Sequence, residues 1–273
     1  MENIDEVFEF YNAGAEKDRL ERGLGKVEFY RTKEILKKYI IAPNNIIYDV
    51  GGGIGVYSGW LAERNNEVHL LELTPWAVEY SVENQKENSR FIAEVCDARK
   101  IGRPDESADI VLLMGPLYHL QNKEERLQVL NEARRVLKPG GLMFSAGISK
   151  FSSTTWALST YGKDNNFLDD DIFDNMIKEE LSSGIHIRPK EYPYFIAQSY
   201  FHTPSGMQKE IETVGFNVIQ KYAVEGIIWF TPFLDEKWED AKSRERLLNI
   251  VRRTENEEEV MGMSPHFILV SRK

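Results

Sequence analysis

The sequence of 273 residues predicts a doubly wound α/β fold, in which helices cover both faces of a mostly parallel sheet. Three observations support this prediction. Residues 46–50 are a short apolar run that leads into a glycine-rich turn, as expected of a buried strand followed by a helix. Apolar runs and helical patterns then alternate as far as residue 147. Residues 109–114 are an acid followed by a continuous apolar run, which is typical of a central parallel strand buried on both faces.

Length and composition limit the classes of protein to consider. At this length an α/β fold often forms one body, so we expect a single domain over residues 1–273. The 34 Lys and Arg against 44 Asp and Glu give a formal net charge of −10, which disfavours nucleic acid as a partner. No apolar run approaches the roughly 20 residues of a membrane helix, and the first residues are acidic rather than signal-like, so we expect a cytoplasmic protein without membrane contact. The single cysteine, Cys96, excludes an internal disulfide.

Residues 1–40 are predicted to form an N-terminal helical cap. Helical periodicity runs from Val7 to about Arg22 and from Val27 to about Tyr39. Glycines separate the two stretches, and both precede the first predicted strand.

The glycine-rich turn is predicted to bind a cofactor. Gly51, Gly53 and Gly55 allow backbone conformations closed to other residues and leave no Cβ between main chain and ligand. Their spacing is G-x-G-x-G, and Asp49 precedes them. The dinucleotide fingerprint G-x-G-x-x-G would need a glycine at position 56, where the sequence has Val56. The spacing therefore favours a cofactor other than a nicotinamide dinucleotide.

Two motifs resemble those of class I S-adenosylmethionine-dependent methyltransferases. One is the glycine turn with Asp49. The other is the sequence ARRVLKPGG at residues 133–141, which closely resembles the stretch before the fifth strand in small-molecule and lipid-quinone methyltransferases. The resemblance implies a Rossmann-like sheet of seven strands with an antiparallel last strand. It also implies S-adenosyl-L-methionine as cofactor, a cofactor-binding core over 41–147 and a C-terminal part of the sheet over 202–273.

The remaining cofactor-binding predictions follow from the ends of the predicted strands. Glu72 lies 23 positions after Asp49, at a strand end where a carboxylate can accept both ribose hydroxyls. The resemblance implies that Asp97 accepts a hydrogen bond from the adenine amino group and that the Ala98 amide meets a ring nitrogen. An aspartate that only caps the next turn is the alternative. The predicted site is completed by Leu73, Met114 and Gly115.

The resemblance also implies that the leading helices fold back over the cofactor. Tyr11, Tyr30 and Arg31 are the candidates there, because aromatic rings can cover a sulfonium or a substrate and a guanidinium can bind a carboxylate. The alternative for each is a packed amphipathic helix with a solvated arginine.

Residues 148–201 are predicted to form an inserted substrate lid. The alternation of strands and helices stops there, and the segment is rich in aromatic residues, which argues against disorder. The acids at 169–171 are predicted to open a helix of this lid. We prefer that role to metal binding and expect no metal site.

For catalysis, His119 is the best-placed general base, because it follows the fourth predicted strand and histidine titrates near neutral pH. His202, at the end of the predicted lid, is the second candidate, and Tyr118 could orient the acceptor oxygen. Amine-directed nucleic-acid and glutamine methyltransferases carry an acid or amide where this chain has Gly115, which argues against those acceptors.

The sequence thus predicts an S-adenosylmethionine-dependent methyltransferase that acts on a small-molecule acceptor. Two alternatives stay open: a nicotinamide or flavin oxidoreductase, and a non-catalytic domain that keeps the cofactor loop as an interaction scaffold. Oxygen, nitrogen and carbon acceptors all fit the sequence, some of them without a general base, and it specifies no oligomeric state.

Overall fold

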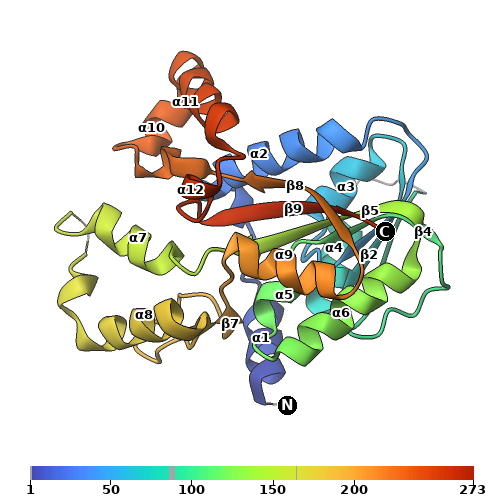
Figure 1. Cartoon of the computed structure of the whole chain (residues 1–273), viewed down its shortest axis with the longest axis horizontal. Coiled ribbons are helices and arrows are strands. Elements are labelled where there is room, and N and C mark those ends of the chain that lie inside the picture. The colour runs from blue at the N-terminus through green and yellow to red at the C-terminus, as the bar shows by residue number, and fades with distance from the viewer. Residues whose placement is uncertain (1, 86–89, 164) are drawn as a thin grey trace.

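The computed structural model describes residues 2–85, 90–163 and 165–273, so the ends of the predicted ranges at Met1 and the lid residue Asp164 lie outside the described residues. Within these residues a seven-stranded sheet has the order β3-β2-β1-β4-β5-β9-β8 (Figure 1). Its strands are β1 (Ile46–Val50), β2 (Glu67–Glu72), β3 (Phe91–Val95), β4 (Ala108–Leu113), β5 (Leu137–Ile148), β8 (Asn217–Ala223) and β9 (His266–Arg272). Only β9 runs antiparallel to its neighbours β5 and β8. The predicted fold class is confirmed.

Helices cover both faces of the sheet because its central strands are apolar on both sides. In β4, Val111 packs with α6 (Lys123–Val136) and α9 (Pro204–Thr213), whereas Leu112 packs with α2 (Leu24–Tyr39) and α3 (Val56–Ala62). The remaining helices of the core are α4 (Pro75–Asn84) and the single turn α5 (Pro116–His119). The alternation explains the continuous apolar run in the sequence, since neither face of this strand meets water.

The N-terminal segment differs from its predicted form. The first helix, α1 (Glu2–Asn12), ends ten residues before the predicted end at Arg22. Gly14 has a φ of 88°, and a Cβ there would lie 3.3 Å from the ring of Trp76. This left-handed glycine ends the helix. The chain then turns through the short helix η1 (Arg19–Glu21) and passes over the glycine turn, where the Glu16 side chain lies close to Gly53.

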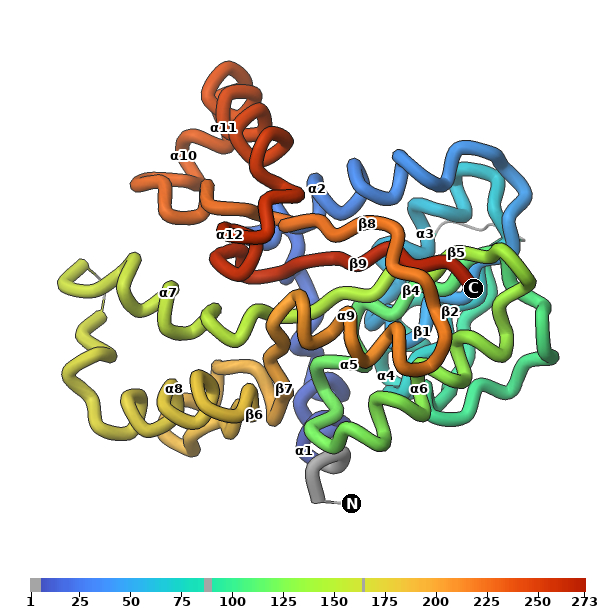
Figure 2. Tube along the Cα trace, in the orientation of Figure 1, coloured from blue at the N-terminus to red at the C-terminus, as the bar shows by residue number. Residues whose placement is uncertain are grey.

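The segment between β5 and α9 carries two helices and a two-stranded hairpin, α7 (Ser152–Thr160), α8 (Asp171–Ser183), β6 (Ile185–His186) and β7 (Ser199–Tyr200). The α7 and α8 helices extend away from the sheet, at the left in Figure 1 and in the trace of Figure 2. They share an aromatic cluster around Phe173. The α8 helix begins as predicted, because the Asp170 carboxylate accepts hydrogen bonds from the backbone amides of Ile172 and Phe173.

A second excursion separates β8 from β9. It contains η3 (Gly226–Phe230), α10 (Leu234–Glu239), α11 (Ala241–Thr254) and α12 (Glu258–Met261). Its apolar side chains pack around Val27 of α2, so the excursion rests on the N-terminal segment. Among the described residues no helix is both long enough and apolar enough to cross a membrane.

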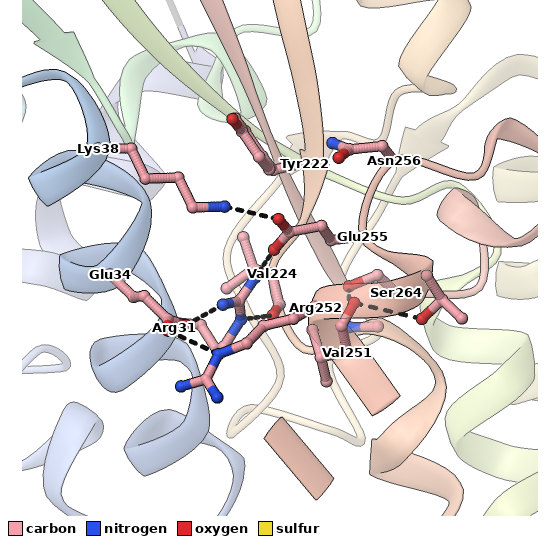
Figure 3. A network of polar contacts seen from close by, with 12 residues as sticks. Arg31, Glu34, Lys38, Tyr222, Val224, Val251, Arg252, Glu255, Asn256 and Ser264 are labelled. Atoms are coloured by element: carbon pink, nitrogen blue, oxygen red, sulfur yellow. Dashed lines mark hydrogen bonds and ion pairs between the residues drawn. The ribbon is translucent and has the colours of Figure 1, made fainter. Parts of the chain in front are cut away.

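Arg31 fastens this excursion to α2, as Figure 3 shows. Its side chain is fully buried and pairs with the carboxylates of Glu34 and Glu255, while Nε donates to the carbonyl of Val224 at 3.2 Å. Lys38 also pairs with Glu255 at 2.6 Å. Arg31 was predicted to bind a carboxylate of the cofactor or substrate. That prediction is wrong, because the guanidinium already pairs with two carboxylates of the chain itself.

Arg31→Met is expected to lower the free energy of unfolding by about 3 kcal/mol, because it leaves the buried Glu255 short of its main counter-charge. Urea unfolding followed by circular dichroism measures the change. Arg252→Met is the matched control. Arg252 lies at the surface with 31% of its side chain exposed, and it also pairs with Glu34. Its replacement should lower the free energy of unfolding by less than about 1 kcal/mol. Equal losses in the two variants would contradict the assigned role of Arg31.

Candidate functional site

A pocket lies beyond the carboxyl ends of β1, β2, β3 and β4, where open α/β sheets bind ligands. It encloses about 1080 Å³, counting the mouth that opens to solvent. Most of the sequence-predicted site residues line it together: Tyr11, Asp49, Gly51, Gly53, Glu72, Leu73, Asp97, Ala98, Met114, Gly115, Tyr118 and His119. These residues come from the N-terminal segment and from four different strand ends.

The glycine turn forms one wall of the pocket with its backbone. Gly51, Gly53 and Gly55 have φ values of 68°, 59° and 73°, all left-handed. A Cβ on Gly51 would lie 2.6 Å from the ring of Pro116. Gly55 does not line the pocket; it precedes α3, and a Cβ there would point at Leu70. The turn therefore presents bare main chain to a ligand, as a flat or charged group requires.

Glu72 is fixed at the end of β2 by the backbone around it. Its carboxylate accepts hydrogen bonds from the Gly53 amide at 2.9 Å and from both the amide and the hydroxyl of Thr74 at 3.0 Å. The side chain is only 6% exposed, and burial raises its pKa. Each carboxylate oxygen has two acceptor positions, so Oε2, which accepts only from Gly53, keeps one for a ligand.

Asp49 adds a second carboxylate beneath the glycine turn. It is buried and accepts a hydrogen bond from the Ser58 hydroxyl at 2.7 Å. Burial raises the pKa of Asp49 to about 6, and the nearby charge of Glu72 acts in the same direction. Two carboxylates in a partly enclosed pocket favour a cationic ligand.

Asp97 caps the turn that follows β3, which is the alternative role given to it from the sequence. Its Oδ1 accepts a hydrogen bond from the Arg99 amide at 2.9 Å, and its carboxylate pairs with the Arg99 guanidinium at 2.6 Å. Asp97 and Ala98 nevertheless line the pocket. Binding of an adenine amino group by Asp97 stays a prediction.

Tyr11, Tyr118 and His119 form an aromatic group in the pocket lining. The Tyr11 hydroxyl lies 2.6 Å from Nε2 of His119, and the Tyr118 hydroxyl donates to the Met114 carbonyl at 2.9 Å. Burial lowers the pKa of His119 to about 3, so its ring is neutral at physiological pH. A neutral imidazole with so low a pKa is a weak proton acceptor. These features favour a pocket-lining role for His119 over that of a general base.

The loop after α1 contributes residues that the sequence analysis missed. Arg19 and Glu16 line the pocket, and they form an ion pair at 3.0 Å. Arg19 also makes a two-pronged pair with Glu28 of α2, at 2.6 and 3.1 Å. The only local signal for this loop is Gly14, which fits a helix end as well as a helix interior.

Two further predicted site residues lie elsewhere. Tyr30 is 41% exposed and packs edge-on against Trp238 of α10. His202 is buried beside the end of β5, where its amide donates to the Ile148 carbonyl, and its Nε2 lies 3.4 Å from Glu210, which is itself paired with Arg126. Neither residue lines the pocket, so the structure contradicts their predicted roles in it. Both were placed there by their position in the chain, but Trp238 of α10 and Glu210 of α9 are the side chains they contact.

One cluster outside the pocket has donor atoms that could hold a metal ion. Atoms of Glu28, Glu225 and His266 lie within 4.8 Å of one another. However, Arg19 already neutralises Glu28, and Nδ1 of His266 lies 2.7 Å from Glu225. Burial lowers the pKa of His266, but the two glutamates overcome this effect and raise it to about 9. An imidazolium thus supplies the positive charge of this cluster.

His266 gives the stability of the fold a defined pH dependence. Its folded pKa lies above the ordinary value of 6.5, so its contribution is complete below pH 6.5 and is lost as the pH rises through about 9. Between these values the wild type should lose up to about 1.4 kcal/mol per pH unit relative to His266→Gln. Urea unfolding of both proteins across this range measures the difference. If the free energies of unfolding of the two proteins changed in parallel with pH, the neighbouring glutamates would not raise the pKa of His266.

The sheet order, the antiparallel β9 and the bare glycine turn define the fold of class I S-adenosylmethionine-dependent methyltransferases. Residues 48–145 match the family described as "Methyltransferase domain". A solved S-adenosylmethionine-dependent methyltransferase from Mesorhizobium loti shares this fold over 93% of this chain and 100% of its own, with a TM-score of 0.61 and 14% identity. Residues 48–145 therefore match a methyltransferase domain within a chain of this fold, and the predicted resemblance is confirmed.

Curated relatives match the same core region. The human "Probable tRNA methyltransferase 9B" is 29% identical over 99 residues, which are 36% of this chain and 20% of that protein. The ubiquinone/menaquinone biosynthesis C-methyltransferase UbiE of Acidiphilium cryptum (strain JF-5) is 30% identical over 112 residues, 40% of this chain and 44% of that protein. The chain thus spans less than half the length of these relatives.

Proposed function

We propose that the protein transfers a methyl group from S-adenosylmethionine to a small-molecule acceptor. The observation that carries this proposal is the joint placement of the glycine turn and Glu72. Gly53 donates its amide to the Glu72 carboxylate at 2.9 Å, so the turn and the predicted ribose-binding acid form one rigid unit. In this proposal the unit holds the sugar of the cofactor, and Asp97 and Ala98 lie beside its base.

The charges of the pocket support this cofactor. S-adenosylmethionine carries a sulfonium and an ammonium group against a single carboxylate, and when bound it supplies the methyl group from the sulfonium. The pocket wall carries four carboxylates and two guanidinium groups, those of Glu16, Asp49, Glu72, Asp97, Arg19 and Arg99. This balance suits a ligand with two cationic groups and one anionic group better than it suits a dinucleotide with a pyrophosphate.

The acceptor in this proposal is small because the N-terminal segment covers the pocket. Tyr11 reaches across to His119, and Glu16 lies against Gly53, so a bulky acceptor would meet the chain before it met the methyl group. The role of these side chains is to hold the acceptor in line and to exclude water, since positioning supplies much of the rate of such a displacement. The predicted lid over 148–201 would close the other side, where its hairpin contacts Gln121.

A tRNA acceptor is the second candidate, because one set of relatives is named for it. The net charge of −10 is opposite to the charge that binding a polyanion needs. Incubation with tritiated S-adenosylmethionine and either total tRNA or a small-molecule extract separates the two. We expect label in the extract and none in tRNA.

The deciding experiment is isothermal calorimetry with S-adenosylhomocysteine, with NADH as the control. We expect affinity in the micromolar range for the first ligand and no heat from the second. A preference for NADH would revive the oxidoreductase alternative. No heat from either would leave the scaffold alternative and would remove the proposed cofactor.

A further inference from the structure

The helix α1 carries two stripes of side chains that face different parts of the molecule. Val7 and Tyr11 are four residues apart, so they lie on one face of the helix, and both line the pocket. Glu6 and Phe10 form the neighbouring stripe with the same spacing, and this stripe contacts Arg188 of the predicted lid. The helix therefore lies between the pocket and the predicted lid, next to α5 (Figure 1).

The hydrophobic core does not hold α1 in place. Among the side chains of α1 that the structure describes, those of residues 6–12, none belongs to the apolar clusters that pack the sheet, the predicted lid and the excursion after β8. Val7 is nevertheless only 7% exposed, and it lines the pocket. A helix of 11 residues is marginal on its own, so its contacts with side chains of other elements decide where it lies.

The chain is anchored again soon after α1. Leu20 of η1 belongs to one of the core clusters, and Arg19 pairs with Glu28 of α2. Between α1 and η1 the chain makes a turn in which Gly14 and Asp18 have φ values of 88° and 57°, both left-handed. This turn joins a helix outside the core to a residue inside it, which is the arrangement of a hinge.

Arg188 fastens α1 from the side of the predicted lid. Its guanidinium pairs with the Glu6 carboxylate at 2.7 Å and lies 5.2 Å from the centre of the Phe10 ring. It also donates to the Pro193 carbonyl at 3.2 Å, which ties Arg188 to its own loop. The side chains of Arg188 and Glu6 are 19% and 27% exposed, so their ion pair is partly shielded from water and is stronger than a fully exposed one.

The loop that carries Arg188 is itself held next to the pocket. It connects β6 and β7, and the Gln121 side-chain amide donates to the carbonyls of His186 and Ser199 at 3.0 and 3.3 Å. Gln121 lies two residues after His119, whose Nε2 is 2.6 Å from the Tyr11 hydroxyl. One stripe of α1 is therefore held by Arg188, and the other by His119.

We propose that α1 is a gate over the pocket, that residues 13–18 are its hinge, and that Arg188 is the latch that keeps it closed. The proposal rests on the proposed methyltransferase function and gives the predicted lid a role in ligand entry. When the pair with Glu6 breaks, Val7 and Tyr11 leave the pocket together, because both stripes belong to one helix. Arg188 is a positioning residue, since it does not line the pocket and acts on a ligand through α1.

The test measures how fast S-adenosylhomocysteine enters and leaves the full-length protein, by stopped-flow tryptophan fluorescence. A latch sets how often the gate opens, so Arg188→Met should raise the association and dissociation rate constants together. Each should rise by about 3- to 10-fold, as expected from the loss of a partly shielded ion pair and a cation–π contact. The dissociation constant should then change by less than about twofold. A residue that only supported the bound ligand would instead change the dissociation rate constant and the affinity.

Two further sets of variants test the contact itself. Lys178→Met is the matched control, because Lys178 pairs with Asp174 within α8 of the predicted lid, and both rate constants should keep their wild-type values. Glu6→Arg and Arg188→Glu should each release the latch. The double variant restores an ion pair with the charges exchanged, so its rate constants should return toward those of the wild type. No such rescue would occur if the single variants had only damaged the fold.

A second readout uses the protein without a ligand. Hydrogen exchange of the backbone amides of residues 2–12, measured by mass spectrometry, should be about fivefold faster in Arg188→Met than in the wild type. Exchange in β4 should stay the same. Unchanged exchange in α1, or a rise in the dissociation rate constant alone, would overturn the proposal. If exchange in α1 accelerates but S-adenosylhomocysteine does not bind the wild type, the latch stands and the proposed function fails.

Discussion

Gly51→Ala is expected to weaken S-adenosylhomocysteine binding by about 10- to 100-fold. The residue has a φ of 68°, and an added Cβ would lie 2.6 Å from the ring of Pro116, which cannot rotate away. A left-handed conformation at a residue other than glycine costs about 1–3 kcal/mol. The variant can relieve this strain by distorting the turn, and binding must then restore the turn at that energetic cost. Calorimetry measures the affinity, and thermal unfolding shows whether the fold persists.

Gly140→Ala is the control that separates backbone strain at a positive φ from a steric clash of the added Cβ. Gly140 has a φ of 81°, but a Cβ there would meet nothing within 4 Å. This variant should lose about 1–3 kcal/mol of stability through backbone strain alone and should keep the wild-type affinity. If Gly51→Ala also kept that affinity, the turn would not be the cofactor wall.

Glu72→Ala is expected to weaken S-adenosylhomocysteine binding by about 1.5–3 kcal/mol, the range for hydrogen bonds to a charged group. Two effects combine in this variant. The ligand loses an acceptor for its ribose hydroxyls, and the amides of Gly53 and Thr74 lose the carboxylate that fixes the turn. Calorimetry at constant salt measures the loss.

Glu72→Gln distinguishes these two effects. The glutamine keeps a carbonyl oxygen for one donor but removes the charge, so its affinity should fall between those of the wild type and Glu72→Ala. Glu67→Ala is the surface control, because Glu67 begins the same strand with about half of its side chain exposed. If Glu72→Ala bound as tightly as Glu67→Ala, Glu72 would not belong to the cofactor site.

Three corrections to the sequence predictions, those for Arg31, Tyr30 and the end of α1, share one physical origin. Arg31 and Tyr30 lie on a helix that was rightly predicted, but the helix turns them toward Glu255 and Trp238, more than 200 residues later in the chain. The continuation of α1 to Arg22 fits the local helical pattern, yet Gly14 packs against Trp76 and the helix ends. Each of these three errors concerns a contact partner far away in the sequence.

By itself the sequence determined the order of strands and helices, the glycine turn and the acid at the end of β2. Those features depend on apolar periodicity, capping residues and glycine, which are local properties of the chain. Only the tertiary structure decided that Arg19 and Glu16 join the pocket, that burial weakens His119 as a base, and that Glu225 orients His266. Those properties arise from burial and from pairs of charges separated by long stretches of chain, and no local pattern records which distant residues will meet.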